Sequence, residues 1–177
     1  GLVVQPVNVQ QAGGEDLSRY AFVALSDIGM PGEELERRLN EYVRHGGSLL
    51  ILAGAETARA GKIPVTGVHV SLTRQTQGAS FVDNAYPALN GLGTLQNVQF
   101  YTTARMDAPA GARVAAKLAD NSPLLIDQVL GEGRVLTFGS MLDGIGTDFP
   151  LHKSFLPFVA QTGRYLTGAG DTALSVI

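Results

Sequence analysis

The sequence predicts an α/β fold of three layers, in which helices cover both faces of a largely parallel β-sheet and an antiparallel hairpin is added near residues 98–138. Two apolar runs, residues 21–25 and 48–54, have the pattern of strands that are buried on both faces. Residues 31–45 between them have the apolar spacing of an amphipathic helix. A strand, a helix and a strand in this order form a right-handed parallel unit.

The composition is that of a folded domain with a sizeable core. Of the 177 residues, 45% are hydrophobic and 16% are charged, against about 25% charged residues in a typical globular protein. This length suits one domain, which we expect over residues 2–168, with residues 169–177 as a loose tail. The longest apolar run, residues 49–53, is far shorter than the ~20 residues that cross a bilayer, so we expect no membrane insertion by this segment.

Charge and residue content disfavour several chemistries. A net charge of −3 provides no basic surface for nucleic acid. The chain has no cysteine, which excludes disulfides, thiolate metal sites and cysteine nucleophiles. With only three histidines a polyhistidine metal centre is disfavoured, and we expect no cofactor.

The flanking elements are predicted from shorter patterns. Residues 2–9 are β-branched and partly alternating, which indicates a strand that Pro6 restricts to a sheet edge or a bulge. Residues 61–97 carry only strand fragments and loops. The remaining strands are expected where the hydrophobic period becomes two, at residues 98–102, 113–118, 123–129 and 134–138. Turn residues 131–133 join the last two as a hairpin, and an amphipathic helix follows from Ser154 to Gly168.

Two stretches resemble a known family. Residues 18–54 (SRYAFVALSDIGMPGEELERRLNEYVRHGGSLLILAG) look like the strand-helix-strand unit of class I glutamine amidotransferase-like domains with a flavodoxin-like sheet. Residues 122–166, which contain GEGRVL, TDFPLH and FLPFV, resemble the end of the amidotransferase-like domain of bacterial membrane proteins. These proteins, of the aerotolerance-regulator (BatA) type, begin with a double-transmembrane segment. In that family a strand and a helix precede the part that begins here, which implies an excised fragment.

The resemblance implies a domain without catalytic activity. Catalytic class I amidotransferases carry a cysteine in a G-x-C-x-G turn after a buried strand, whereas residues 54–57 here are Gly-Ala-Glu-Thr. They also carry a His-Pro-Glu sequence after a later strand, whereas residues 139–141 are Gly-Ser-Met. The implied function is a binding or assembly module of a membrane-anchored protein, on the periplasmic side of the inner membrane. Its partners would be proteins or other domains of the same protein.

A ligand crevice is predicted where the parallel strands end, because ligands bind beyond the carboxyl ends of the strands in open α/β sheets. The residues expected to line it are Asp27, Gly54, Ala55, Glu56, Thr57 and Ser140. A small-ligand sensor using this crevice is one alternative function. For Asp27 the competing interpretation is that its side chain caps the helix that follows.

Three residues of the loop before the last helix, Asp143, Asp148 and His152, have alternative interpretations. With Asp27 or Glu56 they would form a metal site, and the alternative function would then be a metal-dependent hydrolase. The competing interpretation is local capping, because aspartates in glycine-rich loops bond their own backbone. A Ser140–Asp148–His152 triad is disfavoured because the sequence around Ser140 lacks the second glycine of a nucleophile elbow.

Overall fold

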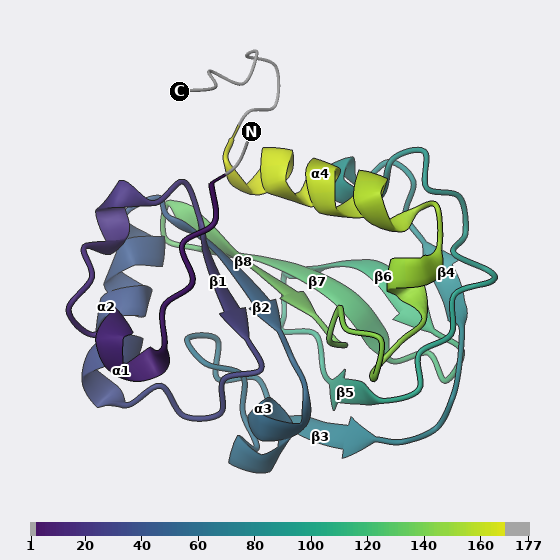
Figure 1. The fold of residues 1–177 in the computed structure, drawn as a ribbon, viewed down its shortest axis with the longest axis horizontal. Coiled ribbons are helices and arrows are strands. Elements are labelled where there is room, and N and C mark those ends of the chain that lie inside the picture. Colours follow the sequence, from purple (N-terminus) through teal and green to yellow (C-terminus); the bar gives the residue numbers. More distant parts are fainter. Residues whose placement is uncertain (1–2, 169–177) are drawn as a thin grey trace.

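The computed structural model describes residues 3–168, and within them six strands form one twisted sheet (Figure 1). Their order across the sheet is β1 (Val23–Ser26), β2 (Ser48–Leu52), β8 (Gly133–Phe138), β7 (Pro123–Leu130), β6 (Arg113–Leu118) and β4 (Ala79–Val82). A separate antiparallel pair consists of β3 (Val70–Thr73) and β5 (Thr103–Met106). The predicted tail, residues 169–177, lies outside the described residues.

Two longer helices and several short ones accompany the strands. The α-helices are α1 (Val9–Ala12), α2 (Glu33–Arg44), α3 (Ala55–Ala60) and α4 (Phe155–Leu166). The 3₁₀ turns are η1 (Leu17–Arg19), η2 (Pro87–Leu89) and η3 (Phe149–Leu151). Within residues 3–168 no helix has the length and apolar character that crossing a membrane requires.

The predicted strand-helix-strand unit is confirmed. β1 and β2 pair in parallel, with Leu25 opposite Ile51. α2 connects them and buries Leu35, Leu39 and Val43, which share one face of the helix because they lie four residues apart.

The predicted flavodoxin-like sandwich with a mostly parallel sheet is wrong. β2 pairs in parallel with β8, but the neighbours β8–β7, β7–β6 and β6–β4 are all antiparallel. The reason is the length of the connections: residues 119–122 join β6 to β7, and residues 131–132 join β7 to β8. A parallel crossover needs a dozen or more residues, so these short turns force antiparallel neighbours. The expected hairpin through residues 131–133 is confirmed, and it belongs to the main sheet rather than being an addition to a parallel one.

The predicted strand at residues 2–9 is wrong as well. Residues 3–8 have no regular structure, and α1 begins at Val9. The side chain of Asn8 accepts a hydrogen bond from the amide of Gln11 at 2.9 Å and caps this short helix. The β-branched residues of this segment favoured a strand and gave no indication of the helix. The strand expected at residues 98–102 begins at Thr103 instead.

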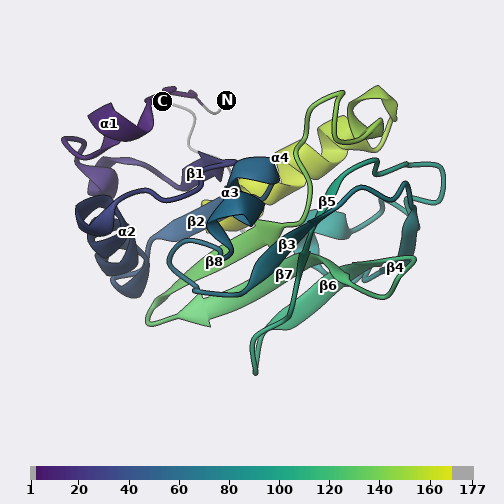
Figure 2. The ribbon, with the colours of Figure 1, turned by 90° about the horizontal axis from the view of Figure 1, so that it is seen from below.

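Alternate residues of β2 face opposite sides of the sheet and belong to two separate cores. Leu49 and Ile51 pack with α2, whereas Leu50 and Leu52 lie against the core that includes Phe158 of α4. The two cores therefore place α4 and α2 on opposite faces of the sheet, and Figure 2 shows these two helices well apart. Because β1, β2 and β8 run in parallel, their carboxyl ends meet at one edge of the sheet, and this edge positions the candidate site.

Candidate functional site

A crevice of about 360 Å³ lies at the carboxyl ends of β1 and β2. We call it the strand-end crevice. It brings together three of the predicted residues, Asp27, Gly54 and Ala55, with segments that are distant in sequence. The other lining residues are Leu72, Arg74, Thr102, Thr103, Met141, Asp143, Ile145 and Gly146. Its size is within the ~300–1,000 Å³ of small-molecule sites.

Asp27 is placed by an unusual backbone and by α3. It follows β1 with φ of +48°, a left-handed conformation that Asp tolerates better than most residues. Its carboxylate accepts hydrogen bonds from the amides of Glu56 at 3.2 Å and Thr57 at 3.0 Å, and from the Thr57 hydroxyl at 3.1 Å. Asp27 therefore caps a helix, but the helix is α3, which begins 28 residues later, and not α2, which follows it.

Gly54 makes this contact possible. A Cβ atom on Gly54 would lie 2.7 Å from Cγ of Asp27 and within 2.9 Å of both carboxylate oxygens. Only glycine therefore leaves room for the carboxylate over the first turn of α3. The strand-to-helix turn at Gly54 and Ala55 and the side chain of Asp27 form one unit.

Three further residues predicted for the crevice do not line it. The Glu56 side chain is exposed and pairs with Arg59 at 2.7 Å. Thr57 is buried, and its single hydroxyl proton lies between two acceptors, Oδ1 of Asp27 at 3.1 Å and the Ile28 carbonyl at 3.2 Å. Ser140 is buried, and its hydroxyl donates to the Met141 carbonyl at 3.2 Å.

The loop aspartates are divided between two places. Asp143 lines the crevice, and its Oδ1 accepts hydrogen bonds from the amides of Ile145 at 3.2 Å and Gly146 at 2.7 Å. Asp148 instead accepts the Gln99 amide at 2.7 Å and lies 3.1 Å from Nε2 of His152. Among residues 3–168 no three His, Asp or Glu side chains come together as metal ligands would.

The pKa of Asp148 reflects its local bonding. Burial raises this pKa, but the hydrogen bonds from the Gln99 amide and from His152 outweigh the burial and hold it below the usual range. Ser140 lies outside this pair, because its hydroxyl bonds only backbone carbonyls in the described part of the chain. The capping interpretation of these loop residues fits the observed hydrogen bonds.

Sequence reasoning missed the far wall of the crevice. Leu72 and Arg74 come from β3 and the residue after its end. Thr103 begins β5, and Thr102 directly precedes it. Thr103 is only 1% exposed. The sequence around these residues has no strong periodicity, so nothing in it indicated that β3 and β5 would pair beside the ends of β1 and β2.

A buried polar cluster under α4 was also missed. Asp127 of β7 accepts hydrogen bonds from the phenol of Tyr86 at 2.8 Å, from Arg134 at 3.1 Å and from the phenol of Tyr165. Burial, followed by the charge of Asp127, raises the pKa of Tyr86 far above its ordinary value. An aspartate inside the apolar run of residues 123–130 was the available signal, because buried charges are normally paired.

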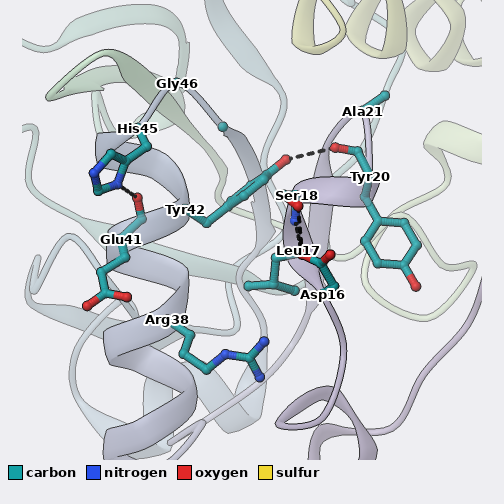
Figure 3. Close-up of a pocket in the computed structure, with 11 residues that line it drawn as sticks. Asp16, Leu17, Ser18, Tyr20, Ala21, Arg38, Glu41, Tyr42, His45 and Gly46 are labelled. Carbon is teal, nitrogen blue, oxygen red and sulfur yellow. Dashed lines mark hydrogen bonds between the residues drawn. The ribbon is translucent and has the colours of Figure 1, made fainter.

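A second hollow, an open groove of about 460 Å³, lies between η1 and α2 (Figure 3). Its polar side chains are already engaged: the Tyr42 hydroxyl donates to the Tyr20 carbonyl at 3.3 Å, and Nδ1 of His45 lies 2.7 Å from the Glu41 carbonyl. Arg38 donates to the backbone carbonyls of Gly13 and Glu15. These bonds attach the N-terminal segment to α2, so the groove is a structural junction.

No protein-family model matches the chain, and no curated protein does. Solved structures match it in fold. Cytoplasmic protein STM3548 from Salmonella typhimurium is 18% identical with a TM-score of 0.69, and STM1381 from S. typhimurium LT2 is 16% identical with a TM-score of 0.68; each match covers 92% of this chain and 76% of the other. The mmIFT52 N-terminal domain is 15% identical with a TM-score of 0.60 and covers 95% and 83%.

These findings overturn the resemblance drawn from residues 18–54 and 122–166. The structural neighbours are cytoplasmic Salmonella proteins and an mmIFT52 domain, not glutamine amidotransferase-like domains, and the sheet is mixed. The aerotolerance-regulator assignment and the flavodoxin-like assignment are therefore both corrected. At these identities the likeness concerns the fold alone.

Proposed function

We propose that this chain is a non-catalytic binding domain that holds a small zwitterionic molecule in the strand-end crevice. The observation that carries the proposal is the meeting of unengaged polar groups of both signs in one concave site of about 360 Å³. A small-molecule site is typically an apolar pocket with a few well-placed polar groups, and this crevice has that character.

The polar groups suit a molecule with separated charges. One oxygen of Asp143, Oδ1, is used by its own loop, while Oδ2 makes no hydrogen bond within the described residues. Arg74 is exposed at the wall and has no ion-pair partner in the described part of the chain. Asp143 is therefore available for an ammonium group, and Arg74 for a carboxylate, which guanidinium binds in a bidentate manner.

The remaining wall supports a small ligand of this kind. Leu72, Met141 and Ile145 supply apolar surface, and Thr102 and Thr103 complete the wall. Asp27 also faces the crevice, but its two oxygens already accept three hydrogen bonds. We therefore assign Asp27 a positioning role and assign charge recognition to Asp143 and Arg74.

The role of the crevice within a larger assembly stays a proposal. A binding or assembly role beside protein partners is compatible with this crevice, and no residue of it is proposed as a nucleophile or a base. The periplasmic location and the membrane anchor rested on the corrected amidotransferase-like resemblance, and neither forms part of the proposed function.

Calorimetric titration with L-serine, which carries an ammonium, a carboxylate and a hydroxyl, tests the proposal. Ethanolamine, propionate and glycerol each present only part of this set. We expect binding of L-serine and at least about tenfold weaker binding of the other three, since each lost charge contact is worth about 1.5–3 kcal/mol.

The variants Arg74→Gln and Asp143→Asn should each weaken the binding of L-serine by about tenfold. Arg59→Gln on the exposed face of α3 is the matched control and should leave it unchanged. Equal binding of glycerol would assign the crevice to polyols. An absence of binding by all four probes at millimolar concentration would contradict a ligand function for the crevice.

A further inference from the structure

The helix α4 is apolar on two opposite faces, and only one of them is covered. Phe158, Thr162 and Leu166 are buried against the sheet. On the opposite side Leu156 is 74% and Val159 42% exposed, and Leu151 of the adjoining η3 is 86% exposed. A helix with apolar side chains on all sides is normally buried on all sides. The exposed apolar side of α4 is therefore suited to cover by a partner.

The exposed side chains of α4 form one strip, and Leu151 of the adjoining η3 is exposed near its start. Leu156, Val159 and Ala160 lie three and four residues apart, and Arg164 lies four residues beyond Ala160, so they are neighbours on one face of the helix. We call Leu151, Leu156, Val159, Ala160 and Arg164 the outer face of α4. Figure 1 shows α4 along the outside of the molecule, over the sheet.

The charged side chains of this segment are of one sign. Residues 149–168 contain no Asp or Glu. Lys153 and Arg164 are exposed near the two ends of the strip, and no carboxylate in residues 3–168 pairs with either of them. A surface of complementary charge would therefore be acidic at its edges.

We propose that the outer face of α4 docks an amphipathic helix of a partner protein, whose apolar ridge is flanked by Asp or Glu. The site is distinct from the strand-end crevice and does not depend on it. An acidic flank at each end of the partner helix would meet Lys153 and Arg164, while leucine-sized side chains would cover Leu156 and Val159.

A second copy of this chain fits the surface poorly. A two-fold axis that packs α4 against itself in antiparallel orientation places Lys153 of one copy near Arg164 of the other. A parallel arrangement places each cation near its own equivalent. Like charges that face each other across an interface oppose association, so the charge pattern favours a different partner. A membrane surface is disfavoured because two cations are fewer than a polybasic patch has.

Fluorescence anisotropy with two designed helical peptides tests the proposal. Both carry the same leucine ridge, and one has Glu and the other Lys at its flanks. We expect the Glu peptide to bind at least about tenfold more tightly, and about 0.5 M salt to reduce this preference. Leu156→Asp should weaken the binding of the Glu peptide by at least about tenfold. Met30→Asp, at another exposed apolar residue (59%) before α2, is the control and should not weaken its binding.

A charge reversal distinguishes specific docking from nonspecific hydrophobic association. The double variant Lys153→Glu and Arg164→Glu should no longer bind the Glu peptide and should bind the Lys peptide instead. Equal binding of both peptides, or binding of neither, would overturn the proposal. So would sedimentation showing a wild-type dimer that Leu156→Asp dissociates, because the occupant would then be a second copy. Binding to anionic vesicles that Leu156→Asp abolishes would assign the face to a membrane.

Discussion

The phenol of Tyr86 donates a 2.8 Å hydrogen bond to the carboxylate of Asp127 in the interior between the sheet and α4. Arg134 and Tyr165 bond the same oxygen, while the other oxygen of Asp127 is buried and has no partner among residues 3–168. The rings of Tyr86 and Tyr165 meet edge to face at 5.2 Å, and Arg134 stacks on Tyr165 at 4.5 Å. One buried charge thus connects η2, β7, β8 and α4.

Removing the Tyr86 hydroxyl should destabilise the fold. Tyr86→Phe takes one of three donors from a buried carboxylate, and we expect the free energy of unfolding to fall by about 1.5–3 kcal/mol. Urea denaturation measures this loss. Tyr101→Phe removes a hydroxyl from an exposed side chain and should change the stability by less than about 0.5 kcal/mol. Equal effects of the two variants would mean that the Asp127 cluster contributes little.

The same phenol predicts the response to alkaline pH. The raised pKa of Tyr86 means that the folded state favours the neutral phenol more than the unfolded state does. This stabilisation is fully present below the unfolded pKa of about 10 and decreases above it, by about 1.4 kcal/mol per pH unit for one proton. Burial also raises the pKa of Tyr42, so part of the decrease should persist in Tyr86→Phe. Parallel stability curves of the two proteins above pH 10 would contradict the assignment.

The turn of the β7–β8 hairpin packs directly on the end of α2. A Cβ atom on Gly133 would lie 2.1 Å from the carbonyl oxygen of Val43 and 2.2 Å from that of Gly47. Both are backbone atoms that cannot move aside, so Gly133→Ala should lower the free energy of unfolding by at least about 3 kcal/mol. Gly144→Ala, where a Cβ meets nothing within 4 Å, is the control and should be near neutral. Thermal unfolding of the two variants checks the difference.

Asp27 and Gly54 should behave as one unit in a double-mutant cycle. Asp27→Ala removes the cap of α3, at about 1–2 kcal/mol. Gly54→Ala places a Cβ atom 2.7 Å from Cγ of Asp27 and displaces the same carboxylate, so its effect should be similar. Because both changes break one contact, the double variant should lose little more than either single variant. Strict additivity of the two losses would refute this coupling.

The sequence predicted local elements better than their arrangement. The periodicity of residues 21–54 is local, and it indicated β1, α2 and β2 and their parallel pairing. The alternation of residues 113–138 indicated β6, β7 and β8, and the glycine turn indicated the hairpin. The error was to treat these strands as an antiparallel addition to a mostly parallel sheet. They belong to the main sheet, and their connections of two and four residues make most of its pairings antiparallel.

The sequence predicted where the crevice lies but only some of the residues that line it. The rule that strand ends gather ligand residues located Asp27, Gly54 and Ala55. Arg74 and Thr103 come from the β3–β5 pair, whose position depends on long-range packing and leaves no periodic signal. Similarly, Asp27 reaches over α3 because Gly54 leaves room for it, a contact between residues 27 apart in the chain. Whether the crevice binds a ligand stays a prediction.

A two-dimensional NMR titration of the isotope-labelled chain with L-serine tests the central claim most directly. If the strand-end crevice binds it, the backbone amides of Gly54, Ala55, Thr103 and Gly146 should shift with one common saturation curve. The Asp143→Asn variant should need about ten times more L-serine for the same shifts. Shifts confined to the groove between η1 and α2, or no saturable shifts at millimolar L-serine, would contradict the claim.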